Sequence, residues 1–171
     1  MKRMKAGARQ WSFDWAMAAK MALLLSLSLI IPGLGWDQQV TGPLVNALLL
    51  VSVSTVGVGG AVMVGVLPSL MALVRGVLPL PMVVMVPYII LGNAALVVVF
   101  ALLRSRNYWL GLSVAAAVKA GLLALAVSYL VVVPANLAIL MQWPQLYTAL
   151  LGGVIAYTAL GVYGLARRSR G

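Results

Sequence analysis

Long apolar stretches, separated by short polar or basic segments, run along almost the whole chain. The stretches without any charged residue span residues 21–36, 38–74, 76–103 and 120–166. Because a helix needs about 20 apolar residues to cross a bilayer, the second and fourth stretches are each long enough for about two crossings, or for one crossing and a loop. The pattern predicts six transmembrane helices at about residues 15–31, 40–56, 59–75, 82–103, 108–133 and 146–165.

The composition supports the prediction of transmembrane helices. The chain has 171 residues, of which 64% are hydrophobic and 8% are charged, and its mean hydropathy is +1.09. A soluble domain of this size would need more polar surface to face water. We therefore expect an all-α integral membrane bundle that forms a single domain over residues 1–171 and is embedded in a lipid bilayer.

The distribution of basic residues predicts the topology. Nine of the twelve lie in the two tails and in one turn, namely Lys2, Arg3, Lys5, Arg9, Arg104, Arg106, Arg167, Arg168 and Arg170. Cytoplasmic flanks are enriched in lysine and arginine, and six helices place all three segments on one side. Both termini are thus predicted to be cytoplasmic, although the turn near Gly57, which should face the same side, carries no charge.

Several kinds of chemistry are excluded by the residues that the chain lacks. It contains no cysteine and no histidine, and its two acids are Asp14 and Asp37. We therefore expect no metal site, no cofactor and no paired-carboxylate catalysis. The net charge of +10 does not indicate a nucleic-acid partner, because the charges cluster at helix ends. An enzyme is not expected, since only a serine–lysine arrangement of Lys119 with Ser69, Ser113 or Ser128 is formally possible.

Two basic residues interrupt the apolar part of the chain and are candidate site residues. Arg75 follows the third predicted helix, and Lys119 lies near the middle of the fifth. A charge within a membrane is costly and by default suggests a functional site. Arg75 either snorkels to the outer headgroups or binds an anion at the mouth of a pocket. Lys119 either contacts a ligand or makes structural hydrogen bonds with Asn93 or Asn46, unless the boundary of the fifth helix lies elsewhere.

Neutral polar residues supply further candidates for a solute site. Asn46 and Asn93 lie within apolar helices, and Gln142 and Trp143 lie in the predicted loop 134–145. Such residues either hold helices together by hydrogen bonds or orient a ligand. Trp143 either covers a pocket or belongs to the aromatic belt at the membrane interface.

Small residues recur at a spacing of four on several predicted helices. Gly57, Ala61, Gly65 and Ser69 mark one face of the third helix, and Ala18 and Ala22 begin a similar stripe on the first. Residues four apart share a helix face, and small side chains allow a second helix to approach closely. The stripes therefore predict helix packing, within the chain or with another subunit.

The chain resembles the substrate-binding (S) component of an energy-coupling factor transporter. The stretches that carry the resemblance are Ala18-x-x-x-Ala22, the segment TGPLVNALLL at residues 41–50, and residues 67–93. The resemblance implies a multi-pass protein of a bacterial plasma membrane that captures a vitamin-like solute from outside and docks on a transmembrane scaffold subunit driven by two ATPase subunits. It also implies that Ala18 and Ala22 contact the scaffold, and that Arg75, Gln142 and Trp143 lie in the ligand pocket.

Two hypotheses for the function follow. The first is a solute-binding transport subunit for a small polar or anionic solute, in which Arg75 and Lys119 supply charge, and Asn46, Asn93 and Gln142 orient the solute. The second is a membrane anchor or accessory subunit of a larger complex, because the chain is also similar to small membrane proteins found beside iron-only hydrogenases. An enclosed outward cavity lined by the basic residues favours the first hypothesis, and a filled bundle favours the second.

Overall fold

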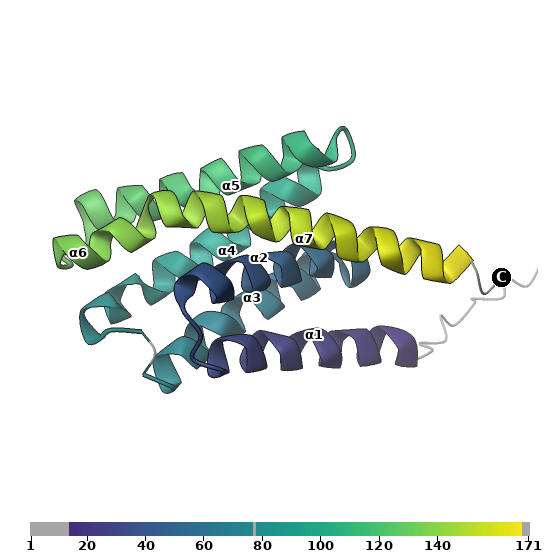
Figure 1. Ribbon diagram of the computed structural model, residues 1–171, viewed down its shortest axis with the longest axis horizontal. Coiled ribbons are helices and arrows are strands. Elements are labelled where there is room, and N and C mark those ends of the chain that lie inside the picture. The colour runs from purple at the N-terminus through teal and green to yellow at the C-terminus, as the bar shows by residue number, and fades with distance from the viewer. Residues whose placement is uncertain (1–13, 77, 169–171) are drawn as a thin grey trace, which may run out of the picture.

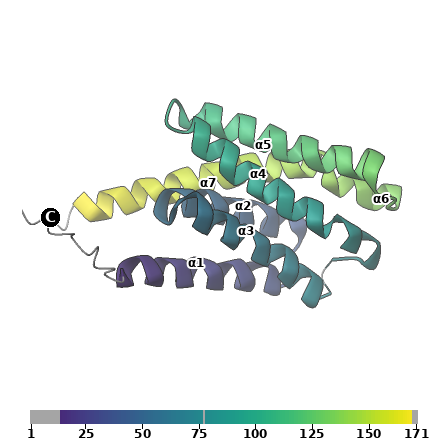
Figure 2. The same ribbon diagram turned by 180° about the vertical axis from the view of Figure 1, so that it is seen from behind.

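The computed structural model describes residues 14–76 and 78–168, and it shows an elongated bundle of antiparallel helices (Figures 1 and 2). No strand occurs in these two ranges. The long helices are α1 (Trp15–Gly33), α2 (Gln38–Thr55), α3 (Gly57–Val74), α4 (Val86–Leu103), α5 (Tyr108–Leu125) and α7 (Trp143–Arg168). The shorter elements are a 3-10 helix (Leu80–Met85) that leads into α4, a π-helical turn (Ala126–Leu130) that ends α5, α6 (Ala135–Ala138) and a 3-10 turn (Ile139–Met141).

The all-α class predicted from the sequence is confirmed, and within residues 14–76 and 78–168 five segments are long and apolar enough to cross a membrane. They contain α1, α3, α4, α5 and α7. Helix α2 does not belong to this set, because Gln38, Gln39, Thr41 and Asn46 lower its hydropathy. Nine of its residues are nevertheless buried, among them the polar residues Asn46 and Ser52, so part of the polar surface of α2 faces other helices, whereas Gln39 is exposed.

Helix α2 lies among four other helices, and a glycine of α7 allows α7 to pack closely against it. It packs against α1, α3, α4 and α7. A Cβ atom added to Gly152 of α7 would lie 2.7 Å from the carbonyl oxygen of Pro43 and 2.8 Å from the backbone nitrogen of Ala47. Because those are backbone atoms of α2, only glycine permits the two helices to lie so close.

The predicted helix boundaries agree with the observed ones within a few residues, except around the fifth and sixth helices. The prediction extended the fifth helix to residue 133, but it ends in the π-helical turn at Leu130. Val131 has an extended backbone, and residues 131–134 form no helix up to Pro134, which lacks a backbone N–H. The prediction also placed a loop over residues 134–145. That segment is partly helical, and α7 begins at Trp143.

The two ends of the bundle differ in charge. One end, called the basic end here, holds the start of α1, the turn at residues 104–107 and the end of α7 (Figure 1). The opposite end, called the far end, holds the connections 34–37, 75–79 and 131–142. The charges used to predict the topology belong in part to Lys2, Arg3, Lys5, Arg9 and Arg170, which lie outside the described residues.

Three of the four residues in the predicted small-residue stripe of α3 lie on its packing face, and the fourth, Gly57, is exposed. Ala61, Gly65 and Ser69 are buried, and Gly57 has a positive φ of 80° directly after the connection from α2. The stripe on α1 behaves differently, since Ala18 is half-buried and Ala22 is exposed. Contact of Ala18 and Ala22 with another subunit stays a prediction.

Candidate functional site

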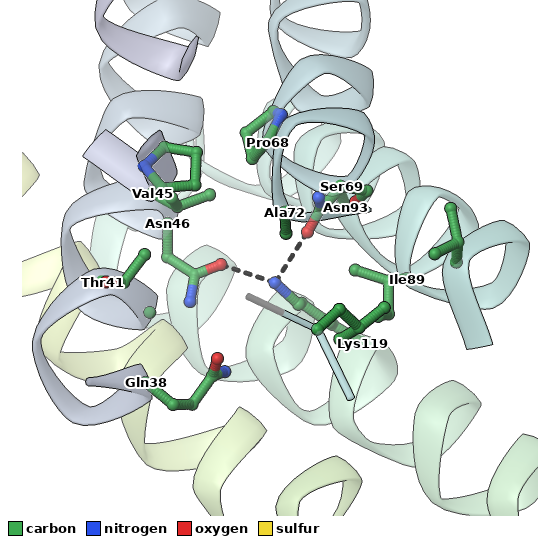
Figure 3. Close-up of a pocket in the computed structure, with 14 residues that line it drawn as sticks. Gln38, Thr41, Val45, Asn46, Pro68, Ser69, Ala72, Ile89, Asn93 and Lys119 are labelled. Carbon is green, nitrogen blue, oxygen red and sulfur yellow. Dashed lines mark hydrogen bonds between the residues drawn. The ribbon is translucent and has the colours of Figure 1, made fainter. Parts of the chain in front are cut away.

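A cavity of about 100 Å³ lies inside the bundle, between the far-end halves of α1 to α4 and the middle of α5 (Figure 3). Six described residues that line it are half-buried, namely Gln38, Thr41, Gly42, Ala72, Leu78 and Ile89, whereas the remaining lining residues, Lys119 among them, are buried. The cavity therefore opens toward the far end and closes near the middle of the bundle.

The closed end of the cavity is formed by Lys119. Its Nζ donates hydrogen bonds to Oδ1 of Asn46, at 2.6 Å, and to Oδ1 of Asn93, at 2.8 Å. Figure 3 shows the Nζ atom between these two amide oxygens, with each bond as a dashed line. The three side chains come from α5, α2 and α4, and each is 2–3% exposed. One polar cluster thus joins three helices of the bundle.

The two amides are oriented by a second set of contacts. Nδ2 of Asn93 donates to the carbonyl oxygen of Gly65, at 2.9 Å, and Nδ2 of Asn46 approaches Oγ1 of Thr148, at 3.5 Å. A backbone carbonyl can only accept a hydrogen bond, so the Gly65 contact fixes the amide of Asn93 with its oxygen toward Lys119. Gly65 and Thr148 therefore act as positioning residues for the cluster.

The position of Lys119 along its helix places it far from both ends of the bundle. It lies eleven residues from each end of the helical segment Tyr108–Leu130, which is about 16 Å of helix in either direction. Its stem packs beside Gly92 of α4, since a Cβ added there would lie 3.4 Å from Cγ of Lys119. A lysine at this depth cannot reach the headgroup region and must find its partners inside the bundle.

The described lining of the cavity carries positive charge without negative charge. Its described lining contains one cation, Lys119, and no acid. The only acids in the chain, Asp14 and Asp37, are exposed, and their carboxylates accept hydrogen bonds from backbone N–H groups at the starts of α1 and α2. The polar lining is completed by Gln38, Thr41 and Ser69, and the rest is apolar. This arrangement suits a compact polar or negatively charged guest.

The structure brings together three of the six residues that the sequence singled out for the solute site. Lys119, Asn46 and Asn93 form the closed end, and the structural hydrogen bonds considered for Lys119 are present. Arg75 is an exposed residue after α3 and does not line the cavity, although Ala72 and Leu78 on either side of it in the chain do.

Gln142 and Trp143 lie away from the cavity. They border a separate groove of about 370 Å³ between α5 and α7, where small residues of α5 leave space. Trp143 is 78% exposed, so it does not cover the cavity that ends at Lys119. They were predicted as site residues because they lie in a predicted outer loop, where the resemblance implied that the ligand pocket lies.

Four polar residues at the site were not predicted as site residues. They are Gln38, Thr41, Ser69 and Thr148. A usable signal existed for α2, because residues 38, 41, 42, 45 and 46 recur every three or four positions and therefore share a face. Ser69 was assigned to the packing stripe of α3 and to a formally possible serine–lysine pair with Lys119, and not to a solute site.

Comparisons with known proteins supply no function for this site. No family model matches the chain, and neither a curated protein nor a solved structure is significantly similar to it.

Proposed function

We propose that this protein is the solute-binding subunit of a transport system and holds a small polar or anionic solute in the cavity that ends at Lys119. The observation that supports this is a buried cation, held by two amide oxygens, at the closed end of a cavity that is open at one end of the bundle. An uncompensated charge at the centre of a membrane helix costs about 2.5–3.5 kcal/mol on insertion scales. A bound anion would offset that cost.

The proposed topology has six crossings, with both termini in the cytoplasm and the far end facing outward. Helix α2 counts as a crossing because it runs the length of the bundle beside α7 (Figure 1). Its polar face would then line a cavity, which is where polar groups are tolerated at membrane depth. The basic end would face the cytoplasm, as the enrichment of lysine and arginine in cytoplasmic flanks favours. The cavity would thus admit a solute from outside.

Transport would require partner subunits. The chain has no phosphate-cradling P-loop sequence of the form GxxxxGK[ST], so we propose that the energy comes from two ATPase subunits through a transmembrane scaffold. The exposed face of α1 around Ala22 offers close packing to such a scaffold. The role that we propose for the chain is therefore that of an S component in a bacterial plasma membrane.

We propose binding rather than covalent catalysis at this site. Ser69 lines the same cavity as Lys119, but no hydrogen bond joins Oγ of Ser69 to any described residue. A lysine that activates a serine must lie within hydrogen-bond reach of it, and Lys119 instead donates to two amides.

The proposal is tested by purifying the protein in mild detergent from its native membranes and identifying what accompanies it by mass spectrometry. We expect a small polar or anionic solute close to one per chain, together with a scaffold subunit and ATPases. A protein without solute that is bound to an unrelated enzyme complex would overturn the proposal. That result would favour the alternative function, a membrane anchor or accessory subunit.

A further inference from the structure

The cavity contains a second polar group besides the Lys119 cluster. The hydroxyl of Ser69 is the one buried side-chain oxygen or nitrogen among the described residues that has no hydrogen-bond partner, and the residue is only 5% exposed. It lies on α3 one turn closer to the far end than Gly65, the residue whose carbonyl holds Asn93. A buried hydroxyl that lines a cavity without a partner indicates that a partner enters the cavity.

The hydrogen-bonding capacity of Lys119 is also incomplete. A lysine ammonium has three N–H groups, and the amides of Asn46 and Asn93 accept two of them at 2.6 and 2.8 Å. Such short distances are typical of charge-assisted bonds. The third N–H has no acceptor among the described residues, and both acceptors that are present are neutral. The cluster therefore lacks one acceptor and one negative charge.

We propose that the solute is a compact monocarboxylate whose two oxygens accept hydrogen bonds from Nζ of Lys119 and Oγ of Ser69. This inference rests on the proposed solute-binding function and narrows it to one chemical class. A carboxylate supplies two acceptor oxygens, one for the third N–H of Lys119 and one for the hydroxyl of Ser69, and it supplies the negative charge that the cluster lacks. Neither a cation nor a neutral amide supplies both.

The size and lining of the cavity limit the rest of the solute. A volume of about 100 Å³ is well below the roughly 300–1,000 Å³ of pockets for drug-sized ligands. It corresponds to roughly three water molecules in the liquid. The walls beside Lys119 and Ser69 include Val45, Pro68 and Ile89, which suit a short alkyl chain. The solute should therefore resemble propionate in size more than benzoate.

The test compares three probes on the full-length protein in detergent by isothermal titration calorimetry. Propionate and propionamide have nearly the same shape but differ in charge, and benzoate carries the same charge on a larger body. We expect propionate to bind at least tenfold more tightly than propionamide and benzoate. Ser69→Ala should weaken propionate binding several-fold, whereas Ser113→Ala, which removes an exposed hydroxyl of α5, should leave it unchanged.

Three results would overturn the carboxylate assignment. They are propionamide binding as tightly as propionate, no binding of propionate, and equal propionate affinity in wild type and Ser69→Ala. The proposed function fails separately, since it requires only that some solute is bound. A neutral solute recovered from native membranes, and lost from a Lys119→Gln variant, would keep the binding function and exclude the carboxylate.

Discussion

Replacement of Lys119 with glutamine is expected to reduce solute binding by about 30-fold or more, because loss of one partner from a buried, hydrogen-bonded charge pair costs about 2–5 kcal/mol. Glutamine keeps an uncharged NH2 group whose two N–H donors can serve the amide oxygens of Asn46 and Asn93, so the fold should survive without the charge. Titration of the variant with propionate, or with the solute recovered from native membranes, measures the effect.

Two matched variants show whether the effect belongs to this particular charge. Lys20 is exposed near the basic end of α1, and Lys20→Gln should leave the affinity unchanged. Arg75 is exposed at the far end, where water and salt screen its charge, so Arg75→Gln should lower the affinity by only about threefold or less. Unchanged affinity in a folded Lys119→Gln protein would remove Lys119 from the binding site.

Replacement of Gly152 with alanine is expected to destabilise the protein by about 1–3 kcal/mol or more, as overpacking of a tight contact does. The added Cβ would lie 2.6 Å from Cβ of Asn46 and within 2.8 Å of two backbone atoms of α2. Because a backbone cannot rotate away, α2 and α7 must separate. Thermal unfolding of the purified variant in detergent measures the loss, and solute binding should weaken as well because Asn46 moves.

Gly161 on the same helix provides the control for this prediction. A Cβ added there meets nothing within 4 Å, and alanine is the better helix former by about 1 kcal/mol. Gly161→Ala should therefore unfold at the wild-type temperature or above it. If Gly152→Ala were as stable as Gly161→Ala, the close contact between α2 and α7 would not exist in the folded protein.

Most of the helical framework could be predicted because membranes impose strong rules on sequence. The apolar runs gave the positions of the long helices, and the small residues Ala61, Gly65 and Ser69 gave the packing face of α3. The end of α5 was missed because residues 131–133 are all valine, and nothing in an apolar run reveals where a helix changes to extended backbone before Pro134.

The candidate site could be predicted only in part, for a different physical reason. Lys119, Asn46 and Asn93 stand out because polar side chains inside apolar helices need hydrogen-bond partners. Those partners are usually other polar side chains within the bundle. Gln142 and Trp143 were grouped with them from their predicted place at the far end, but which face of the bundle a loop residue reaches depends on its three-dimensional path. Ser69 illustrates a further difficulty, since a serine serves equally well as a small packing residue and as a hydrogen-bond donor.

The central claim is that a water-accessible cavity reaches toward Lys119 from outside the membrane, and thiol labelling tests it most directly. The chain has no cysteine, so a single Thr41→Cys substitution in the half-buried cavity wall provides a unique target. An impermeant anionic methanethiosulfonate reagent added to intact cells should modify this cysteine. Ser105→Cys, in the exposed turn at the basic end, should react only after the cells are permeabilised. Labelling of Ser105→Cys in intact cells while Thr41→Cys stays protected would contradict the account.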